Sequence, residues 1–284
     1  MRVCLFWNRT AGGGASLDEI TDAIKKAGHQ VERVISRPDE LSPVHMRGID
    51  CVAAAGGDGT VARVARRLVG GDIPLAIIPL GTANNIATSL SIKGVLSEVV
   101  ARWEQRGIVH LDVGSIDRRR IFFEGLGSGL VAACIEEGDR TLSKDDPGDH
   151  LVAARQMYLN QLDGHEPRRY SITLDDETVE GEYLLVEVLN TSQIGPGVEL
   201  ATNVTSVDGL LSVVALTEDD RRPFADYIAA LRDGRSPEPP FHSWRSRRVE
   251  IRGAERLHVD DMVIPATSLP LEIELKPRSL PILA

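Results

Sequence analysis

The first third of the chain repeats one pattern of hydrophobic and polar positions. Short, wholly apolar runs are followed by polar loops rich in glycine, and then by segments whose apolar residues recur every three or four positions. An uninterrupted apolar run is typical of a strand covered on both faces, and the longer period is typical of a helix lying on a sheet. The alternation therefore predicts strand–helix–strand units with a mostly parallel sheet.

The elements expected from this pattern follow one another as far as about residue 90. Ser16 and Glu19 have the spacing of a capping box, which marks the start of the first helix, and Gly28 is suited to end it. The expected strands span residues 3–7, 30–36, 49–55 and 74–79, and the expected helices span residues 17–29, 60–69 and 85–90.

The pattern changes after about residue 110. Most later segments alternate polar and apolar residues between turn residues, as the strands of an antiparallel sheet do. Residues 143–149 and 233–240 are expected to be loops by composition. Helices are expected only at about residues 130–137, 150–162 and 223–232. The chain is therefore predicted to have an α/β plus β fold, with an N-terminal Rossmann-like α/β domain at 1–114 and a mostly antiparallel β-sandwich domain at 115–269.

The composition restricts the class of partner and the compartment. A hydrophobic fraction of 42% is ordinary for a soluble globular protein of 284 residues. The net charge of −10 argues against nucleic acid as the main partner, because phosphate backbones require a basic surface. No apolar run approaches the roughly 18 residues of a membrane span, and the spacing of the cysteines fits a reducing compartment. We expect a cytoplasmic protein with at most peripheral membrane contact, and a homodimer is compatible with these features.

Three glycine-rich loops are expected at one edge of the predicted parallel sheet. They read NRTAGGGAS, GGDGT and LGTANN, and each follows an apolar strand and precedes a helix. Ligands bind open α/β sheets at the carboxyl ends of the strands. Backbone N–H groups at a helix start attract phosphate. The three loops together therefore favour a nucleotide site, although the chain lacks the G-x-x-x-x-G-K-[ST] phosphate loop.

Asp58 is the charged residue within the second of these loops. One interpretation is structural, since its carboxylate is placed to cap the helix that follows. The other interpretation sets the carboxylate beside a bound polyphosphate, where it would ligate Mg²⁺ or accept a proton from an attacking hydroxyl. A carboxylate among phosphates is unfavourable without a cation or a transferable proton nearby, so this interpretation predicts metal-dependent phosphoryl transfer.

Two motifs in these loops resemble the diacylglycerol kinase catalytic domain family, which includes soluble bacterial lipid kinases and the sphingosine and ceramide kinases. They are GGDGT at 56–60 and PLGTANNIA at 79–87. Weaker motifs follow in the family's order and extend the resemblance over nearly the whole chain. These are Asn8 with Gly12, Phe123 with Gly127 to Gly129, Asn190, DGLLSVVAL at 208–216 and LHVDDM at 257–262.

The resemblance implies a lipid kinase of phospholipid metabolism that uses ATP and Mg²⁺. Asp58 would be the base or the metal contact, and Asp260 a second catalytic residue. The second domain would supply the lipid acceptor side, and the last strand, at about residues 270–284, would return to the first domain. The residues implied around the nucleotide are Asn8, Gly12, Gly57, Asp58, Gly59, Thr60, Gly81, Thr82 and Asn84.

Two of the positions that depart from the family's pattern bear on the chemistry and leave three functional hypotheses open. Met262 stands where the family has a glutamate, and Ser212 replaces an aspartate that would complete a metal site around Asp208. A thioether neither holds a proton nor binds Mg²⁺ usefully. The chain is therefore a lipid kinase, a kinase of the same fold with another hydroxyl acceptor, or a catalytically weak ATP-binding protein with a regulatory role.

Overall fold

The protein is described by a computed structural model covering residues 1–8, 15–42, 46–105, 107–141, 147–266 and 270–284. The loop residues 9–14, with Gly12 among them, and most of the expected loop at 143–149 lie outside the described residues. The chain divides into two compact units: residues 1–112 with 277–284 form unit 1, and residues 113–276 form unit 2.

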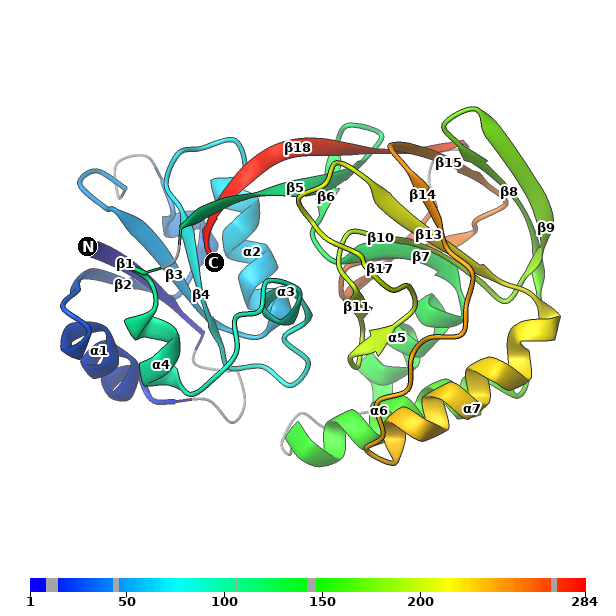
Figure 1. The fold of residues 1–284 in the computed structure, drawn as a ribbon, viewed down its shortest axis with the longest axis horizontal. Coiled ribbons are helices and arrows are strands. Elements are labelled where there is room, and N and C mark those ends of the chain that lie inside the picture. The colour runs from blue at the N-terminus through cyan, green and yellow to red at the C-terminus, as the bar shows by residue number, and fades with distance from the viewer. Residues whose placement is uncertain (9–14, 43–45, 106, 142–146, 267–269) are drawn as a thin grey trace. The chain divides into compact units, whose positions relative to one another are not determined.

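Unit 1 is built on a parallel sheet with the strand order β2-β1-β3-β4-β18. Strands β1, β3 and β4 are wholly or largely apolar, as expected of strands covered on both faces, whereas the edge strand β2 is mostly exposed. One face packs against α1 and α4 through Ile20, Ile24 and Trp103, and α2 lies on the other face (Figure 1). The bounds are β1 Arg2–Trp7, α1 Leu17–Lys26, β2 Gln30–Ile35, η1 Pro38–Glu40, β3 Cys51–Gly56, α2 Asp58–Leu68, β4 Leu75–Pro79, α3 Asn85–Ser89 and α4 Leu96–Ala101.

The local predictions for unit 1 are largely confirmed. The capping box forms, because Glu19 N–H donates to Ser16 Oγ and the Glu19 carboxylate accepts the Ser16 N–H at 2.7 Å. The second helix begins at Asp58, two residues before its predicted start. Helix α4 was not expected; its buried Val100 packs in the same core as Ile20 and Ile24 of α1.

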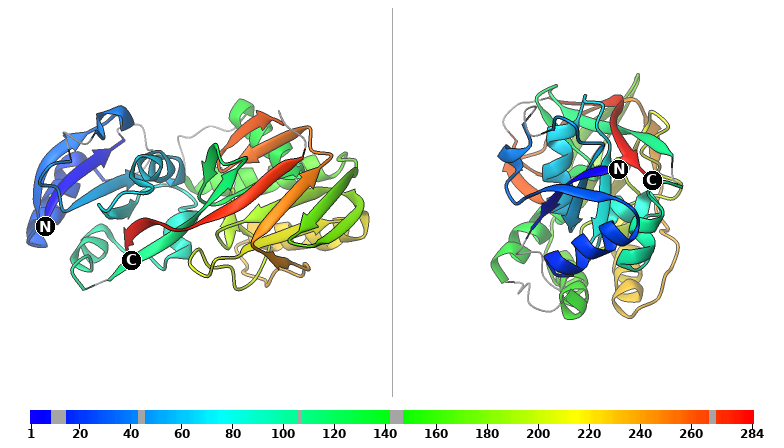
Figure 2. Two further views of the ribbon diagram at one scale, coloured as in Figure 1. Left: turned by 90° about the horizontal axis from the view of Figure 1, so that it is seen from above. Right: turned by 90° about the vertical axis from the view of Figure 1, so that its left-hand side faces the viewer.

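Unit 2 contains two mostly antiparallel sheets and a layer of helices. One sheet has the order β14-β13-β10-β7-β16-β17, and the other includes β18-β15-β8-β9 with the hairpin β5-β6. Figure 2 shows β18, β15, β8 and β9 side by side. The bounds are β5 Ile108–Ile116, β6 Arg120–Phe122, β7 Gly125–Gly129, β8 Arg168–Leu174, β9 Glu177–Tyr183, β10 Leu185–Leu189, β11 Gln193–Ile194, β12 Val198–Glu199, β13 Leu211–Leu216, β14 Trp244–Ser246, β15 Arg248–Arg252, β16 Arg256–Val259, β17 Met262–Pro265 and β18 Leu271–Leu283.

Two hydrophobic cores fill the spaces between the two sheets and between one sheet and the helices. Between the sheets, Val186 and Val188 of β10 pack with residues such as Ile172 and Ile251. On the other face of β10, Leu185 and Leu189 pack beneath the helices. The helical elements of unit 2 are α5 Leu130–Thr141, α6 Pro147–Leu162, η2 Glu218–Asp220 and α7 Arg221–Arg232.

The predicted fold class, an α/β domain followed by a β sandwich, is confirmed. The last strand, β18, pairs with β15 through its first half and with β4 near its end, at Ile282. Among the described residues, no helix is both long and apolar enough to span a membrane.

Candidate functional site

Two of the glycine-rich loops of unit 1 meet backbone to backbone. Gly57 follows β3 and Gly81 follows β4, and a Cβ atom built on Gly57 would lie 3.1 Å from Gly81 Cα. A Cβ on Gly81 would overlap Gly57 Cα. The Leu80 N–H donates to the Gly56 carbonyl at 3.0 Å, so the loops are also joined by a hydrogen bond. The glycines are therefore required by the close approach of two main chains.

Side chains of the predicted nucleotide residues fix the shape of both loops. Thr60 is buried against Gly56, and its Oγ1 accepts a hydrogen bond from Asn8 Nδ2 at 3.2 Å. Asn84 adopts a left-handed backbone with φ of 51°. Its amide closes the second loop by accepting the Gly81 N–H at 2.9 Å and donating to the Gly81 carbonyl at 2.7 Å. The structure thus brings together Asn8 and Thr60, and separately Gly81 and Asn84.

Asp58 lies at the start of α2 but does not cap that helix. The cap residue of α2 is Gly57, and the Asp58 carboxylate instead accepts the N–H of Ile86, in the first turn of α3, at 3.0 Å. Burial raises the pKa of the Asp58 carboxyl, while the backbone N–H groups of Ile86 and Asn85 act in the opposite direction. Of the two interpretations of Asp58, the cap on the following helix is wrong, because the carboxylate instead meets the start of a helix that begins 27 residues later.

Of the remaining nucleotide residues from the sequence, Gly59 and Thr82 lie in the same two loops, and Gly12 lies outside the described residues. Gly59 belongs to the first turn of α2, and Thr82 is exposed in the loop before α3. Helices α2 and α3 both begin at these loops, and helix starts attract anions; at α3 the N–H groups of Asn85 and Ile86 already meet the Asp58 carboxylate. The role of each residue in nucleotide binding stays a prediction.

In unit 2, the structure brings together three motif residues that are far apart in the sequence. Asp260 lies in the turn between β16 and β17, and its Oδ1 accepts the N–H groups of Phe123 and Glu124, both at 2.9 Å. Asn190, which follows β10, donates from Nδ2 to the Phe123 carbonyl at 3.0 Å. Asp260 is 7% exposed, whereas Met262 begins β17 with 45% of its surface exposed. At this turn the Asp260 carboxylate is therefore enclosed and the Met262 thioether is exposed.

Asp208, the predicted metal ligand, is paired with an arginine. Its Oδ2 forms an ion pair with the Arg245 guanidinium, which also donates to Ser212 Oγ at 2.9 Å. The Asp208 carboxylate and the Ser212 hydroxyl, which would bind a cation in this motif, therefore already contact the Arg245 guanidinium. Among the described residues, no group of three or more His, Cys, Asp or Glu side chains is arranged to hold a metal ion.

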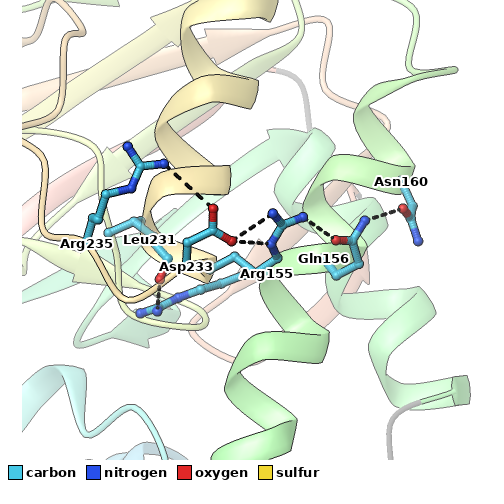
Figure 3. A network of polar contacts seen from close by, with 7 residues as sticks. Arg155, Gln156, Asn160, Leu231, Asp233 and Arg235 are labelled. Atoms are coloured by element: carbon cyan, nitrogen blue, oxygen red, sulfur yellow. Dashed lines mark hydrogen bonds and ion pairs between the residues drawn. The ribbon is translucent and has the colours of Figure 1, made fainter.

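A cavity of about 680 Å³ lies within unit 2, beside α6, α7 and the loop that follows α7. Arg155 of α6 donates to the Leu231 carbonyl of α7 at 2.7 Å (Figure 3). The same picture shows Asp233 joined to Arg235 near the end of α7. The polar residues lining the cavity include Arg155, Gln193, Glu199, Asn203, Arg235 and Glu238.

Sequence reasoning missed Glu187, His258 and Arg245, which make polar contacts around these motifs. A signal existed for Glu187, because it is a lone carboxylate in the apolar run LLVEVL. Arg245 carried no comparable signal, since its partners lie 33 and 37 residues away in the chain.

The backbone crossing of the two loops makes a direct prediction for a glycine substitution. Gly81→Ala should destabilise the protein by about 1–3 kcal/mol, because its Cβ would force the loops apart. Gly107→Ala is the matched control, since no atom lies within 4 Å of its added Cβ. Denaturant unfolding of both variants measures the difference, and equal stability for the two would refute the crossing.

Comparisons with known proteins cover both units. Residues 2–116 match the sequence model of the diacylglycerol kinase catalytic domain, and residues 150–284 match that of the YegS C-terminal NAD kinase beta sandwich-like domain. The chain is 29% identical over 180 residues to "Probable lipid kinase YegS" of Escherichia coli, and equally to that of Shigella boydii. These alignments cover 62% of this chain and 59% of each relative.

Solved structures share the fold. A crystal structure of a diacylglycerol kinase from Bacillus anthracis superposes with a TM-score of 0.77 at 21% identity, covering 99% of this chain and 96% of that chain. A second structure from the same organism gives the same TM-score at 22% identity. The two consecutive matches show that the chain carries a diacylglycerol kinase catalytic domain over residues 2–116, followed by a YegS C-terminal NAD kinase beta sandwich-like domain over residues 150–284.

Proposed function

We propose that the protein transfers the γ-phosphoryl group of ATP to a hydroxyl group of a lipid resembling diacylglycerol. The observation that carries the proposal is the pair of crossed loops in unit 1, with Asp58 between the starts of α2 and α3. Support for a lipid acceptor comes from the family and from the names of the curated relatives. Phosphoryl transfer depends mainly on positioning and on charge stabilisation, which such loops can supply.

The described residues fit a bound nucleotide in unit 1. The N–H groups of Gly57, Gly59 and Thr82 would hold the phosphates. Thr60 and Gly81, whose own N–H groups bond within the loops, would shape the site together with Asn8 and Asn84. Gly12 would belong to the same site, outside the described residues. When bound, Mg²⁺ would neutralise phosphate charge. The single carboxylate of Asp58 is sufficient in such a site, because Mg²⁺ keeps several of its waters and also binds phosphate oxygens.

Asp58 would act as the base for the attacking hydroxyl. Burial raises the pKa of this carboxyl, and a base whose pKa lies nearer the working pH accepts a proton more effectively. The N–H groups of Ile86 and Asn85 favour its ionised form and hold it in one orientation. Asp260 would serve as a second catalytic carboxylate from the acceptor side, in unit 2.

A second candidate is a kinase of the same fold with a more polar hydroxyl acceptor. Two observations favour it: Met262 lacks the carboxylate expected at its position, and the 680 Å³ cavity of unit 2 is lined by charged side chains such as Arg155 and Glu199. Met262 also supports the third candidate, an ATP-binding protein with weak or no transfer. Peripheral membrane contact and a homodimer stay predictions from the sequence.

Asp58→Asn tests whether the carboxylate is a base or a helix cap. The asparagine Oδ1 still accepts the Ile86 N–H, so the cap survives while the base is lost, and transfer should fall by at least about 10²-fold. Because the folded protein raises the Asp58 pKa, its ionisation costs stability as pH rises through that pKa. The variant should therefore be no less stable than the wild type at neutral pH, as measured by denaturant unfolding.

The assay uses labelled ATP with an extracted lipid pool and, in parallel, with a pool of water-soluble metabolites. Label in a lipid that disappears in Asp58→Asn supports the proposal. Label confined to water-soluble compounds supports the second candidate. ATP binding without transfer, and without gain in Met262→Glu, would leave the regulatory role as the better account.

The ion pair of Asp208 makes a prediction about Mg²⁺. Without nucleotide, added Mg²⁺ should not raise the unfolding temperature of the wild type through Asp208, because the cation would have to displace the Arg245 guanidinium. Thermal unfolding of the wild type and of Asp208→Asn with and without Mg²⁺ measures this. A Mg²⁺-dependent rise in the wild type that is lost in Asp208→Asn would restore the metal assignment.

A further inference from the structure

A glutamate and a histidine meet inside unit 2 across an intervening strand. Glu187 of β10 and His258 of β16 are both registered opposite Gly127 of β7, one on each side. Their side chains pass over Gly127, and His258 Nε2 lies 2.7 Å from Glu187 Oε2. A Cβ on Gly127 would overlap the Glu187 carboxylate, so the glycine is what allows the two side chains to meet.

The pair is enclosed beneath the helix layer. The side chains of His258 and Glu187 are 2% and 0% exposed. An ionisable pair at this depth is costly to bury and contributes little net stability compared with apolar residues of similar size. The unfavourable free energy of burying the pair suggests a role beyond packing.

The other ring nitrogen of His258 contacts the turn that carries Asp260. His258 Nδ1 lies 3.1 Å from the Asp260 carbonyl oxygen, and because a carbonyl only accepts, Nδ1 carries the proton. Asp260 has a φ of 52°, a left-handed conformation that is unfavourable for a residue with a side chain. The turn is thus held from two sides: His258 holds its carbonyl, and the N–H groups of Phe123 and Glu124 hold its carboxylate.

The groups around the imidazole favour its protonated form. Burial alone would lower the pKa of His258, but the Glu187 carboxylate and the Asp260 carbonyl outweigh burial and raise it. Burial raises the pKa of Glu187, and His258 opposes that rise. The hydroxyl of Tyr158 in α6 is also buried here. Burial raises its pKa, and the charges of Cys134, Glu187 and Glu124 act in the same direction.

We propose that Glu187 and His258 position Asp260 for the reaction, with Glu187 orienting the imidazole and the imidazole Nδ1–H fixing the turn that presents the Asp260 carboxylate. Both side chains are enclosed, so we assign them as positioning residues rather than catalytic ones. The proposal rests on the proposed function only through the catalytic role of Asp260. The geometry of the clamp itself can be tested without any activity.

Two substitutions at His258 separate the two hydrogen bonds. In His258→Asn, the side-chain nitrogen takes the place of Nδ1 and keeps the bond to the Asp260 carbonyl. In His258→Gln, the longer side chain takes the place of Nε2 and keeps the bond to Glu187 instead. Amide hydrogen exchange at Phe123 and Glu124, whose N–H groups donate to Asp260, reports the state of the turn directly.

We expect exchange at Phe123 and Glu124 to become about five- to tenfold faster in His258→Gln, the factor that corresponds to the loss of one hydrogen bond. In His258→Asn it should change much less. Phosphoryl transfer should fall in parallel, by roughly ten- to a hundredfold in kcat for the Gln variant with little change in KM for ATP. The Asn variant should recover most of that loss.

The outcomes separate this proposal from the proposed function. Equal effects of the two substitutions on exchange, each following the change in global stability, would show that His258 is only a packing residue. If the wild type transfers no phosphate, the proposed function fails, and the exchange data still decide whether the clamp exists. If His258→Gln does not fold, Glu187→Leu is compared with Glu187→Gln by the same exchange measurement. Only the glutamine still holds His258 Nε2, so exchange at Phe123 and Glu124 should become faster in the leucine variant alone.

Discussion

The close approach of Gly57 and Gly81 is the constraint on which the candidate nucleotide site depends. Two loops from neighbouring parallel strands can share this space only if neither carries a side chain at the crossing. The crossing brings the start of α2 beside the start of α3, and this places the Asp58 carboxylate against the Ile86 N–H. The Asp58 carboxylate and the N–H groups at the starts of α2 and α3 therefore lie close together in unit 1.

In unit 2 a glycine also makes a close contact possible, this time between two side chains rather than two main chains. Gly127 lets Glu187 and His258 reach each other over β7, and the imidazole then contacts the turn of Asp260. In both units, a glycine in a motif makes room for a polar contact between elements that are distant in sequence. The motif glycines therefore act mainly by allowing close approach, and the charged groups of each unit depend on them for their orientation.

The sequence predicted the parts of the structure that depend on local pattern. The apolar runs predicted the parallel strands, and Ser16 with Glu19 predicted the start of α1. The motif order also identified Phe123, Asn190 and Asp260, which the six-stranded sheet brings together. What could not be predicted depends on tertiary partners: the helix that Asp58 caps, and the ion pair of Arg245 with Asp208, are set by chain crossings rather than by spacing.

We propose that the two crossed loops hold the phosphates of ATP. This is tested by titrating the protein with a non-hydrolysable ATP analogue and Mg²⁺ while following the amide resonances of the glycines in both loops. We expect the amides of Gly57, Gly59 and Gly81 to shift together with a single affinity, while the amide of Gly107 does not move. Shifts confined to unit 2, or saturation by the analogue with the amides of Gly57 and Gly81 unchanged, would contradict it.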